Sequence, residues 1–273
     1  MNQYSKTARL KTIDVSSRVG AVHFGGIFSI IDFFIAFYAS FSGINLNKNT
    51  LKPKKITEKL FPELFMSKGH CYLAQLVALD TLFENSAFSH KYLCDGSGFF
   101  GHPKRQEKSN LFPVSSGSLG QGITMANGAA LANKLLRNGN TVWTVIGDGE
   151  LNEGSVNEAI QFSNQRRLRH VIVIDNNKQE SLDFTAEILS NGLLEERFKG
   201  YGVNFLTCDG HHLPSLIKVI EKINKKDGTT ILNLDTIKGF GVKFMEKDPK
   251  WHSRRMSEEE YDLSRAELGS TNA

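Results

Sequence analysis

Residues 141–177, TVWTVIGDGELNEGSVNEAIQFSNQRRLRHVIVIDNN, contain two strand patterns separated by one helix pattern. Apolar and β-branched residues fill 141–146 and 170–174, and each run ends in a polar turn, at Gly147-Asp148-Gly149 and at Asp175-Asn176-Asn177. A strand–helix–strand unit of this length predicts two parallel strands joined by a right-handed crossover. The two turns should therefore lie at the same edge of the sheet, which is where α/β sheets bind their ligands.

The rest of the chain extends this pattern in both directions. Helices are expected over residues 5–18, 28–41, 71–83, 120–136, 155–166, 193–201 and 213–225, and further strands over 205–207 and 230–234. Residues 45–67 read as a connection with short structure, and 94–117 as a long irregular loop. Strands that alternate with helices predict an α/β fold, a doubly wound parallel sheet with helices on both faces. We expect one domain over residues 1–273, with a polar C-terminal tail at 261–273.

The two polar turns carry groups that suit a metal and a phosphate. A carboxylate (Asp148) and an amide oxygen (Asn177) are hard ligands of the kind that Mg²⁺ prefers. Gly147 and Gly149 allow the backbone to approach an anion closely. Taken separately, the first turn reads as a plain turn and the second as a helix cap. Because both follow strands at this spacing, a shared ligand site is the better interpretation.

The bulk composition excludes several other classes of protein. The chain has 273 residues, of which 40% are hydrophobic and 23% charged, and its net charge is +4. The basic residues are spread along the chain, so nothing indicates nucleic acid. Three widely spaced cysteines, Cys71, Cys94 and Cys208, form no CxxC pair. They argue against a disulfide framework or a zinc site and are typical of a reducing cytoplasm.

One apolar segment is long enough to cross a membrane. Between Phe24 and Ile44 the only charged residue is Asp32, and this length spans a bilayer. A charge near the middle of such a segment opposes insertion, and a helix buried inside a large domain has the same composition. We therefore expect a soluble protein with no membrane contact.

Further motifs resemble the N-terminal half of the transketolases. The spacing from Gly147-Asp148-Gly149 to Asn176-Asn177 resembles the signature of thiamine-diphosphate enzymes. Family-like motifs stand in family order at His23–Gly26, Ser67–His70, Gly101–Pro103, Ser116–Gly122, Lys238–Gly241 and Trp251-His252. The resemblance runs from about residue 5 to residue 260, and it implies the thiamine diphosphate-binding fold.

The resemblance implies a bound cofactor, thiamine diphosphate, held through Mg²⁺ or a substitute such as Ca²⁺ or Mn²⁺. The metal ligands would be Asp148, Asn177 and the backbone carbonyl of Gln179. Glu153 and Glu158 match two glutamates that couple paired cofactor sites in the family. The cofactor-binding residues implied are Gly117, Ser118, Leu119, Gly147, Asp148, Gly149, Glu153, Glu158 and Asn177.

The activity implied is transfer of a two-carbon ketol unit from a ketose to an aldehyde acceptor. Four histidines, His23, His70, His102 and His252, match catalytic residues that bind sugar hydroxyls and move protons, a task suited to imidazole near neutral pH. The sequence departs from the family pattern at Ser253, His212, Phe184, Phe24 and Phe28. The identity of the sugar or sugar phosphate therefore stays open.

The resemblance ends before the second half of a full-length transketolase. It implies that a second polypeptide binds the pyrimidine ring, and that two copies of each chain form a heterotetramer in the cytoplasm. Three alternatives remain: an enzyme dedicated to a branched sugar, an α-like chain of a 2-oxo acid dehydrogenase, and a non-catalytic regulatory homologue. The dehydrogenase chains lack this histidine set, and no decay is visible at Asp148 or Asn177.

Overall fold

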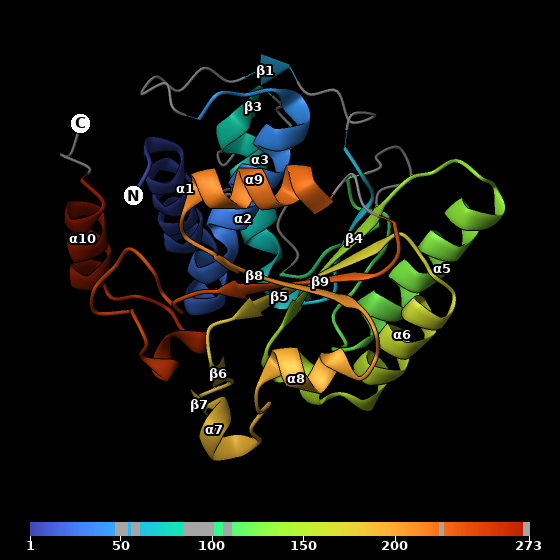
Figure 1. The fold of residues 1–273 in the computed structure, drawn as a ribbon. Coiled ribbons are helices and arrows are strands. Elements are labelled where there is room, and N and C mark those ends of the chain that lie inside the picture. The colour runs from blue at the N-terminus through green and yellow to red at the C-terminus, as the bar shows by residue number, and fades with distance from the viewer. Residues whose placement is uncertain (47–53, 56–60, 85–100, 106–110, 224–226, 270–273) are drawn as a thin grey trace.

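The computed structural model describes residues 1–46, 54–55, 61–84, 101–105, 111–223 and 227–269. Their centre is a five-stranded sheet in the order β2-β4-β5-β9-β8, in which every neighbouring pair is parallel (Figure 1). The strands are β2 (Leu64–Met66), β4 (Val142–Gly147), β5 (His170–Asn176), β8 (Asn204–Asp209) and β9 (Thr230–Asp235). Much of the loop expected over 94–117 lies outside the described residues.

The register of the central strands brings the two polar turns together. Val142 pairs with His170 at the start of β4 and β5, and Gly147 pairs with Asp175 at their end. Asp175 in turn pairs with Leu234 of β9. The prediction that both turns lie at the carboxyl edge of one parallel sheet is confirmed.

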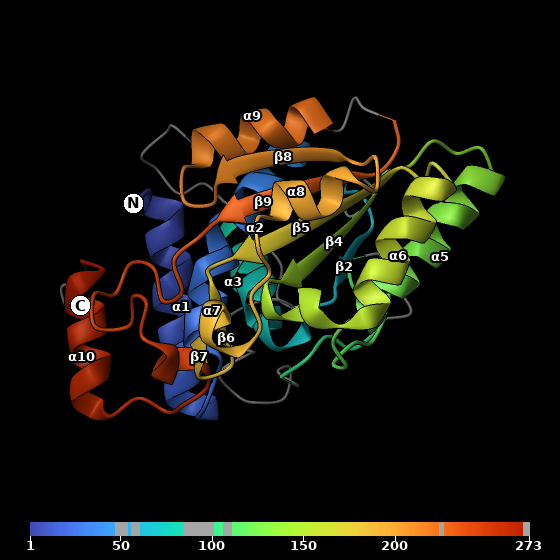
Figure 2. The same cartoon turned by 60° about the horizontal axis from the view of Figure 1, so that its bottom comes forward.

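Helices cover both faces of the sheet because its side chains alternate. Odd-numbered β5 residues such as Val171 and Val173 belong to one apolar cluster, and the even-numbered Ile172 and Ile174 belong to another. The first face packs on α1 (Gln3–Val19), α2 (Phe24–Ser42), α3 (Tyr72–Leu82) and α9 (Leu213–Ile223). The second packs on α5 (Gln121–Leu135), α6 (Gly154–Gln165) and α8 (Leu194–Lys199). Figure 2 shows α5 and α6 side by side, away from α1, α2 and α3, so the doubly wound arrangement is confirmed.

Helix α2 is the apolar segment that raised the membrane alternative. Its length and composition would allow it to cross a membrane, but 89% of its apolar window is buried inside the fold. It contacts α1, α3 and α9. Its single charge, Asp32, accepts hydrogen bonds from both terminal nitrogens of Arg9, at 3.1 and 2.8 Å, and both side chains are buried. A buried helix inside the domain therefore accounts for the pattern.

Some elements differ from the sequence-based expectations. Strand β2 lies in the segment read as a connection, because three residues are too few to show a period. The C-terminal stretch expected as a polar tail begins inside helix α10 (Glu258–Glu267), which starts with a capping box between Ser257 and Glu260. Tyr261, Ser264 and Leu268 are buried, and α10 contacts α1. Their spacing of three and four residues places them on one helix face, which explains the packing.

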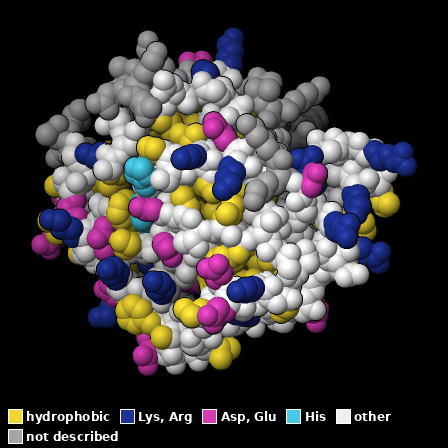
Figure 3. Space-filling model, viewed as in Figure 1, with side chains coloured by type: hydrophobic (Ala, Val, Ile, Leu, Met, Phe, Trp, Pro, Cys, Tyr) yellow, Lys and Arg dark blue, Asp and Glu magenta, His cyan; other side chains and the backbone are white. Residues whose placement is uncertain are grey.

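Small elements follow β5 and lead toward the site. A short hairpin pairs β6 (Gln179–Glu180) with β7 (Asp183–Phe184), and α7 (Thr185–Ile188) comes next. Several large apolar side chains of this segment are exposed, namely Leu182, Phe184, Ile188 and Leu189. Figure 3 shows yellow side chains at this lower edge, and apolar, basic and acidic side chains interspersed over the rest of that face.

Candidate active site

A cavity of about 280 Å³ lies at the carboxyl edge of the sheet. It is formed where the loops after β2, β4 and β5 meet the start of α2 and the segment after β9. Most of the predicted site residues line it: His23, His70, His252, Gly117, Leu119, Gly147, Asp148, Gly149, Asn177 and Gln179. The structure therefore brings together residues from near both ends of the chain, from His23 to His252.

Asp148 is a buried carboxylate directly after β4. One oxygen accepts a hydrogen bond from its neighbour's backbone, Gly149 N, at 3.0 Å. The other accepts from Lys178 N at 2.5 Å and from Gln179 N at 3.3 Å. Burial, reinforced by the nearby Asp175 carboxylate, raises the pKa of Asp148 to about 7. A divalent cation would favour the ionised form at this position.

The turn after β5 supplies further oxygens. Asn177 Oδ1 accepts from Gln179 N at 3.2 Å, and the buried Gln179 Oε1 has no hydrogen-bond partner among the described atoms. Lys178, between them, has a left-handed φ of 63°, a strained conformation typical of ligand clamps. No group of three or more His, Cys, Asp or Glu side chains in the described ranges could hold a metal by itself. The residues present fit a cation that takes additional oxygens from the backbone and from a bound phosphate.

A buried ion pair under the cavity is absent from the sequence-based predictions. Lys68 Nζ donates to Asp175 Oδ2, and both side chains are buried. Asp175 also accepts from Ser29 Oγ and from Thr236 Oγ1, each at 2.5 Å. Burial alone would raise the pKa of Asp175, but the Lys68 ammonium holds it below its usual value. The cavity floor therefore holds the Lys68 ammonium at a fixed position, paired with the Asp175 carboxylate beneath it. Lys68 was visible in the sequence only as the second residue of Ser67–His70.

Glu150 ties three of the site loops together and was also missed. Its Oε1 accepts from Ser67 Oγ and, at 2.7 Å, from Gly120 N. Its Oε2 accepts from Gly147 N at 3.2 Å. The carboxylate is buried, so it fixes the backbones on either side of the cavity. The signal available in the sequence was only a charged residue directly after Gly149.

Three of the predicted histidines form a compact cluster over the cavity. The ring centroids of His23, His70 and His252 lie 4.9, 5.3 and 5.5 Å apart. Burial lowers the pKa of His23 to about 4 and that of His252 to about 3, and it also lowers the pKa of His70. All three are therefore neutral at pH 7 and able both to donate and to accept hydrogen bonds. Lys238 Nζ stands 3.3 Å from His252 Nδ1, a neighbour to which the sequence reasoning gave no role.

The remaining predicted residues border the cavity or lie outside it. His102 packs against Gly69, the residue before His70: its Cδ2 is 3.1 Å from the point where a Cβ on Gly69 would stand. It therefore lies beside the cluster. Ser118 is exposed and is not among the lining residues. Glu153 is the N-cap residue of α6, Glu158 lies within that helix, and both are exposed. The structure thus separates these two glutamates from the cavity.

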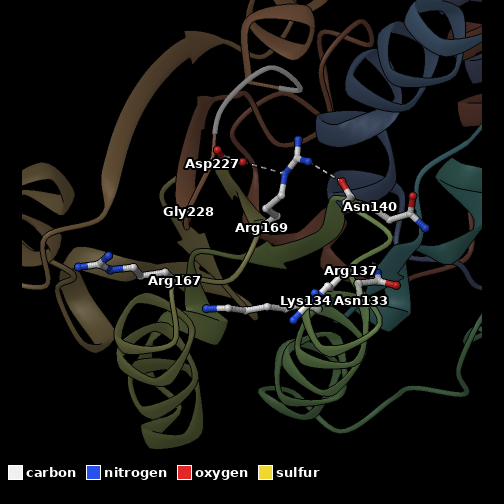
Figure 4. A pocket seen from close by; sticks show the side chains of 10 residues that line it. Asn133, Lys134, Arg137, Asn140, Arg167, Arg169, Asp227 and Gly228 are labelled. Atoms are coloured by element: carbon white, nitrogen blue, oxygen red, sulfur yellow. Dashed lines mark hydrogen bonds and ion pairs between the residues drawn. The ribbon is translucent and has the colours of Figure 1, made fainter.

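A larger cavity, of about 500 Å³, lies at the opposite edge of the sheet. Its residues include Asn140 and Arg169, which lie just before β4 and β5. Two of its four cationic side chains bind nearby groups: Lys134 Nζ donates to Arg166 O, and Arg169 donates to Gly139 O and pairs with Asp227. Figure 4 shows the Arg167 and Arg169 side chains diverging. Basic residues at helix C-termini offset the helix dipole, so size alone does not make this cavity the site.

Comparison with known proteins decides the family. The family described as "Transketolase, thiamine diphosphate binding domain" matches residues 2–273. This chain belongs to the transketolase family. A 6-deoxy-6-sulfo-D-fructose transketolase subunit (SqwG) from Clostridium sp. (strain MSTE9) is 30% identical to it over 98% of this chain and 96% of the relative. An apulose-4-phosphate transketolase subunit from Phocaeicola vulgatus is 30% identical over 94% of this chain and 90% of the relative.

Solved transketolases share the fold of this transketolase-family chain. The enzyme from Leishmania mexicana superposes with a TM-score of 0.77 at 19% identity, covering 98% of this chain and 41% of that one. A transketolase mutant from Pichia stipitis gives 0.81 at 20% identity, covering 98% and 40%. The transketolase-family chain therefore spans about two fifths of the solved chains, whereas it spans nearly the whole of its subunit-type relatives.

Proposed function

We propose that this chain is the diphosphate-binding subunit of a two-subunit transketolase that transfers a two-carbon ketol unit from a ketose to an aldehyde. The observation that carries the proposal is the cavity in which Asp148, Asn177 and Gln179 meet the histidine cluster. Hard oxygen donors on one wall suit a metal and its diphosphate. Neutral imidazoles on the other wall suit the hydroxyls and protons of a sugar.

Thiamine diphosphate with Mg²⁺ is the cofactor that we assign to the cavity. Asp148, Asn177 and the Gln179 carbonyl would hold the metal, and the metal would hold the diphosphate. We assign the anion to a cradle formed by Gly117, Leu119, Gly147 and Gly149, all of which line the cavity. When bound, the cofactor supplies a stabilised carbanion for breaking and forming carbon–carbon bonds.

The histidines are assigned to the sugar. The rings of His23, His70 and His252 lie within 5.5 Å of one another, close enough for several to reach neighbouring hydroxyl groups of one ketose. Because burial lowers the pKa of each clustered ring and keeps it neutral, each offers one donor and one acceptor nitrogen. His102, beside Gly69 and Gly117, would extend the same row.

A partner polypeptide is part of the proposal. The two subunit-type relatives are named as transketolase subunits, and the solved transketolases are more than twice the length matched here. We propose that the partner brings the pyrimidine-binding half, and that two copies of each chain assemble with the exposed Glu153 and Glu158 at their junction. The free cysteines Cys71 and Cys208 suit a reducing, cytoplasmic location.

The names of the relatives point to candidate substrates. One is named for 6-deoxy-6-sulfo-D-fructose and the other for apulose-4-phosphate, and the sulfonate and the phosphate are both anionic. Lys238, which lines the cavity, offers a positive charge that suits an anionic ligand, either the diphosphate of the cofactor or an anionic sugar. A panel of ketose phosphates and sulfonated ketoses, each offered with a common aldehyde acceptor, would identify the donor.

The test of the proposed function is reconstitution. The chain is purified alone and together with the candidate partner, with thiamine diphosphate and Mg²⁺ supplied in both cases. Ketol transfer, followed by chromatography of the sugar products, should appear only in the mixture. Full turnover by the isolated chain would refute the two-subunit assignment. Absence of turnover from every partner and sugar, despite tight cofactor binding, would favour a non-catalytic homologue.

A further inference from the structure

A buried polar triad, Arg9, Asp32 and His211, lies behind the cavity and has no role in the function proposed above. The Arg9 guanidinium binds both Asp32 oxygens, and His211 Nδ1 lies 2.9 Å from Asp32 Oδ2. The three residues come from α1, from α2 and from the loop between β8 and α9. All three side chains are at least nine-tenths buried. Buried ionic groups seldom stabilise a fold more than apolar residues of similar size, so their geometry calls for a reason.

The second ring nitrogen of His211, Nε2, explains the orientation of the imidazole. Ile237 N donates to His211 Nε2 at 2.9 Å. Since Nε2 accepts, it carries no proton, and the proton of the neutral ring is on Nδ1, where it is donated to Asp32. Asp32 thereby selects the tautomer that can hold the Ile237 backbone. The ring also stacks on Phe240, with centroids 3.7 Å apart and planes 16° apart.

Arg9 holds the far end of the same segment. Its Nε donates to Phe240 O at 2.8 Å, so the triad makes hydrogen bonds to the backbone of both Ile237 and Phe240. Lys238 lies between these two residues. Its Nζ donates to Ser181 O at 3.1 Å and reaches His252 inside the cavity. The position of this ammonium is therefore set by a segment that the triad clamps.

We propose that His211 is a positioning residue: oriented by Asp32 and Arg9, it holds the backbone of residues 237–240 so that Lys238 enters the cofactor cavity at a fixed point. The inference rests on the proposed function, because it concerns the same cavity. It assigns no contact between His211 and any ligand. Its consequence is that a change behind the cavity weakens cofactor binding by displacing Lys238.

The test compares two substitutions at position 211 with a neighbouring control. His211→Asn keeps a donor near the Nδ1 position for Asp32 but removes the acceptor for Ile237. His211→Phe keeps the ring on Phe240 but removes both hydrogen bonds. The control is His212→Asn, because the exposed His212 makes its side-chain hydrogen bond only to the nearby Ser215 among the described contacts. Each protein is titrated calorimetrically with thiamine diphosphate and Mg²⁺ in the presence of the partner, and its melting temperature is recorded.

We expect His211→Asn to melt close to the unsubstituted protein while its cofactor affinity falls by about tenfold or more, as is typical for groups that orient a binding residue. In a Lys238→Ala background the same substitution should add less than about a twofold loss, because coupled residues are not additive. Full additivity, or an unchanged affinity of His211→Asn, would overturn the positioning role. Failure of the unsubstituted protein to bind thiamine diphosphate would instead refute the proposed function.

Discussion

Replacing Asp148 by asparagine should stabilise the metal-free protein while removing its metal-dependent ligand binding. Burial and Asp175 raise the pKa of this carboxyl to about 7, whereas the unfolded chain has an ordinary pKa of about 3.9. A carboxyl whose pKa is higher in the fold destabilises the fold once it ionises, so the loss grows as pH rises from about 3.9 to about 7. Three pKa units correspond to about 4 kcal/mol at pH 8. Weakened hydrogen bonds from the Lys178 and Gln179 backbone should reduce the net gain to roughly 2–3 kcal/mol.

The assay is urea unfolding in EDTA, at pH 8 and at pH 5.5. The gain of Asp148→Asn should be smaller by about 2 kcal/mol at pH 5.5, where the native carboxyl is already protonated. Asp262→Asn, at an exposed position in α10, is the matched control and should change stability little. In saturating Mg²⁺ and thiamine diphosphate the unsubstituted protein should become more stable than Asp148→Asn, because only the unsubstituted protein binds these ligands and is stabilised by them. A metal-free variant that is less stable at both pH values would refute the reasoning.

Three further predictions follow from single contacts. His170 is fully buried, and burial lowers its pKa to about 3; below about pH 6.5 the unfolded state therefore binds a proton that the folded state does not, and stability decreases as pH falls. In His170→Gln, urea unfolding should show this pH dependence reduced by about 1.4 kcal/mol per pH unit between pH 6 and 4. An unchanged pH dependence would contradict the assignment. A Cβ on Gly122 would stand 2.5 Å from Ser67 Cα, so Gly122→Ala should cost about 1–3 kcal/mol in thermal unfolding, whereas Gly128→Ala, with nothing within 4 Å, should cost nothing. His70→Ala should abolish most ketol transfer while calorimetry shows cofactor affinity within a few fold, and a collapse of both with the fold intact would remove the histidine from its assigned role.

The central strands could be predicted because their sequence is unambiguous. Residues 142–147 and 170–176 are buried on both faces, so their apolar runs stop abruptly at the polar turns that form the site. Strand β2 has only three residues, too few to show an alternation of apolar and polar side chains, so it is recognised only by its pairing with β4. Helix α10 could not be predicted for another reason. Its buried face has few residues, and it packs on α1, at the other end of the described chain.

Most of the residues that line the cavity could be predicted from the sequence, whereas the contacts that support them could not. Asp148 and Asn177 follow strands in a pattern readable from sequence, and the histidines were found only through family resemblance. The Lys68–Asp175 pair joins positions 107 residues apart, and Glu150 bonds to backbone groups of separate loops. Such contacts exist only after the sheet has closed, so no local spacing predicts them.

Whether thiamine diphosphate binds through a divalent cation held at Asp148 is the question on which the proposed function depends most. Calorimetric titration of the cofactor into the chain with its partner is carried out in Mg²⁺, in EDTA, and with the Asp148→Ala variant in Mg²⁺. We expect saturable binding in Mg²⁺ that disappears both in EDTA and in the variant. Equally tight binding in EDTA, or unimpaired binding by Asp148→Ala, would contradict the proposal.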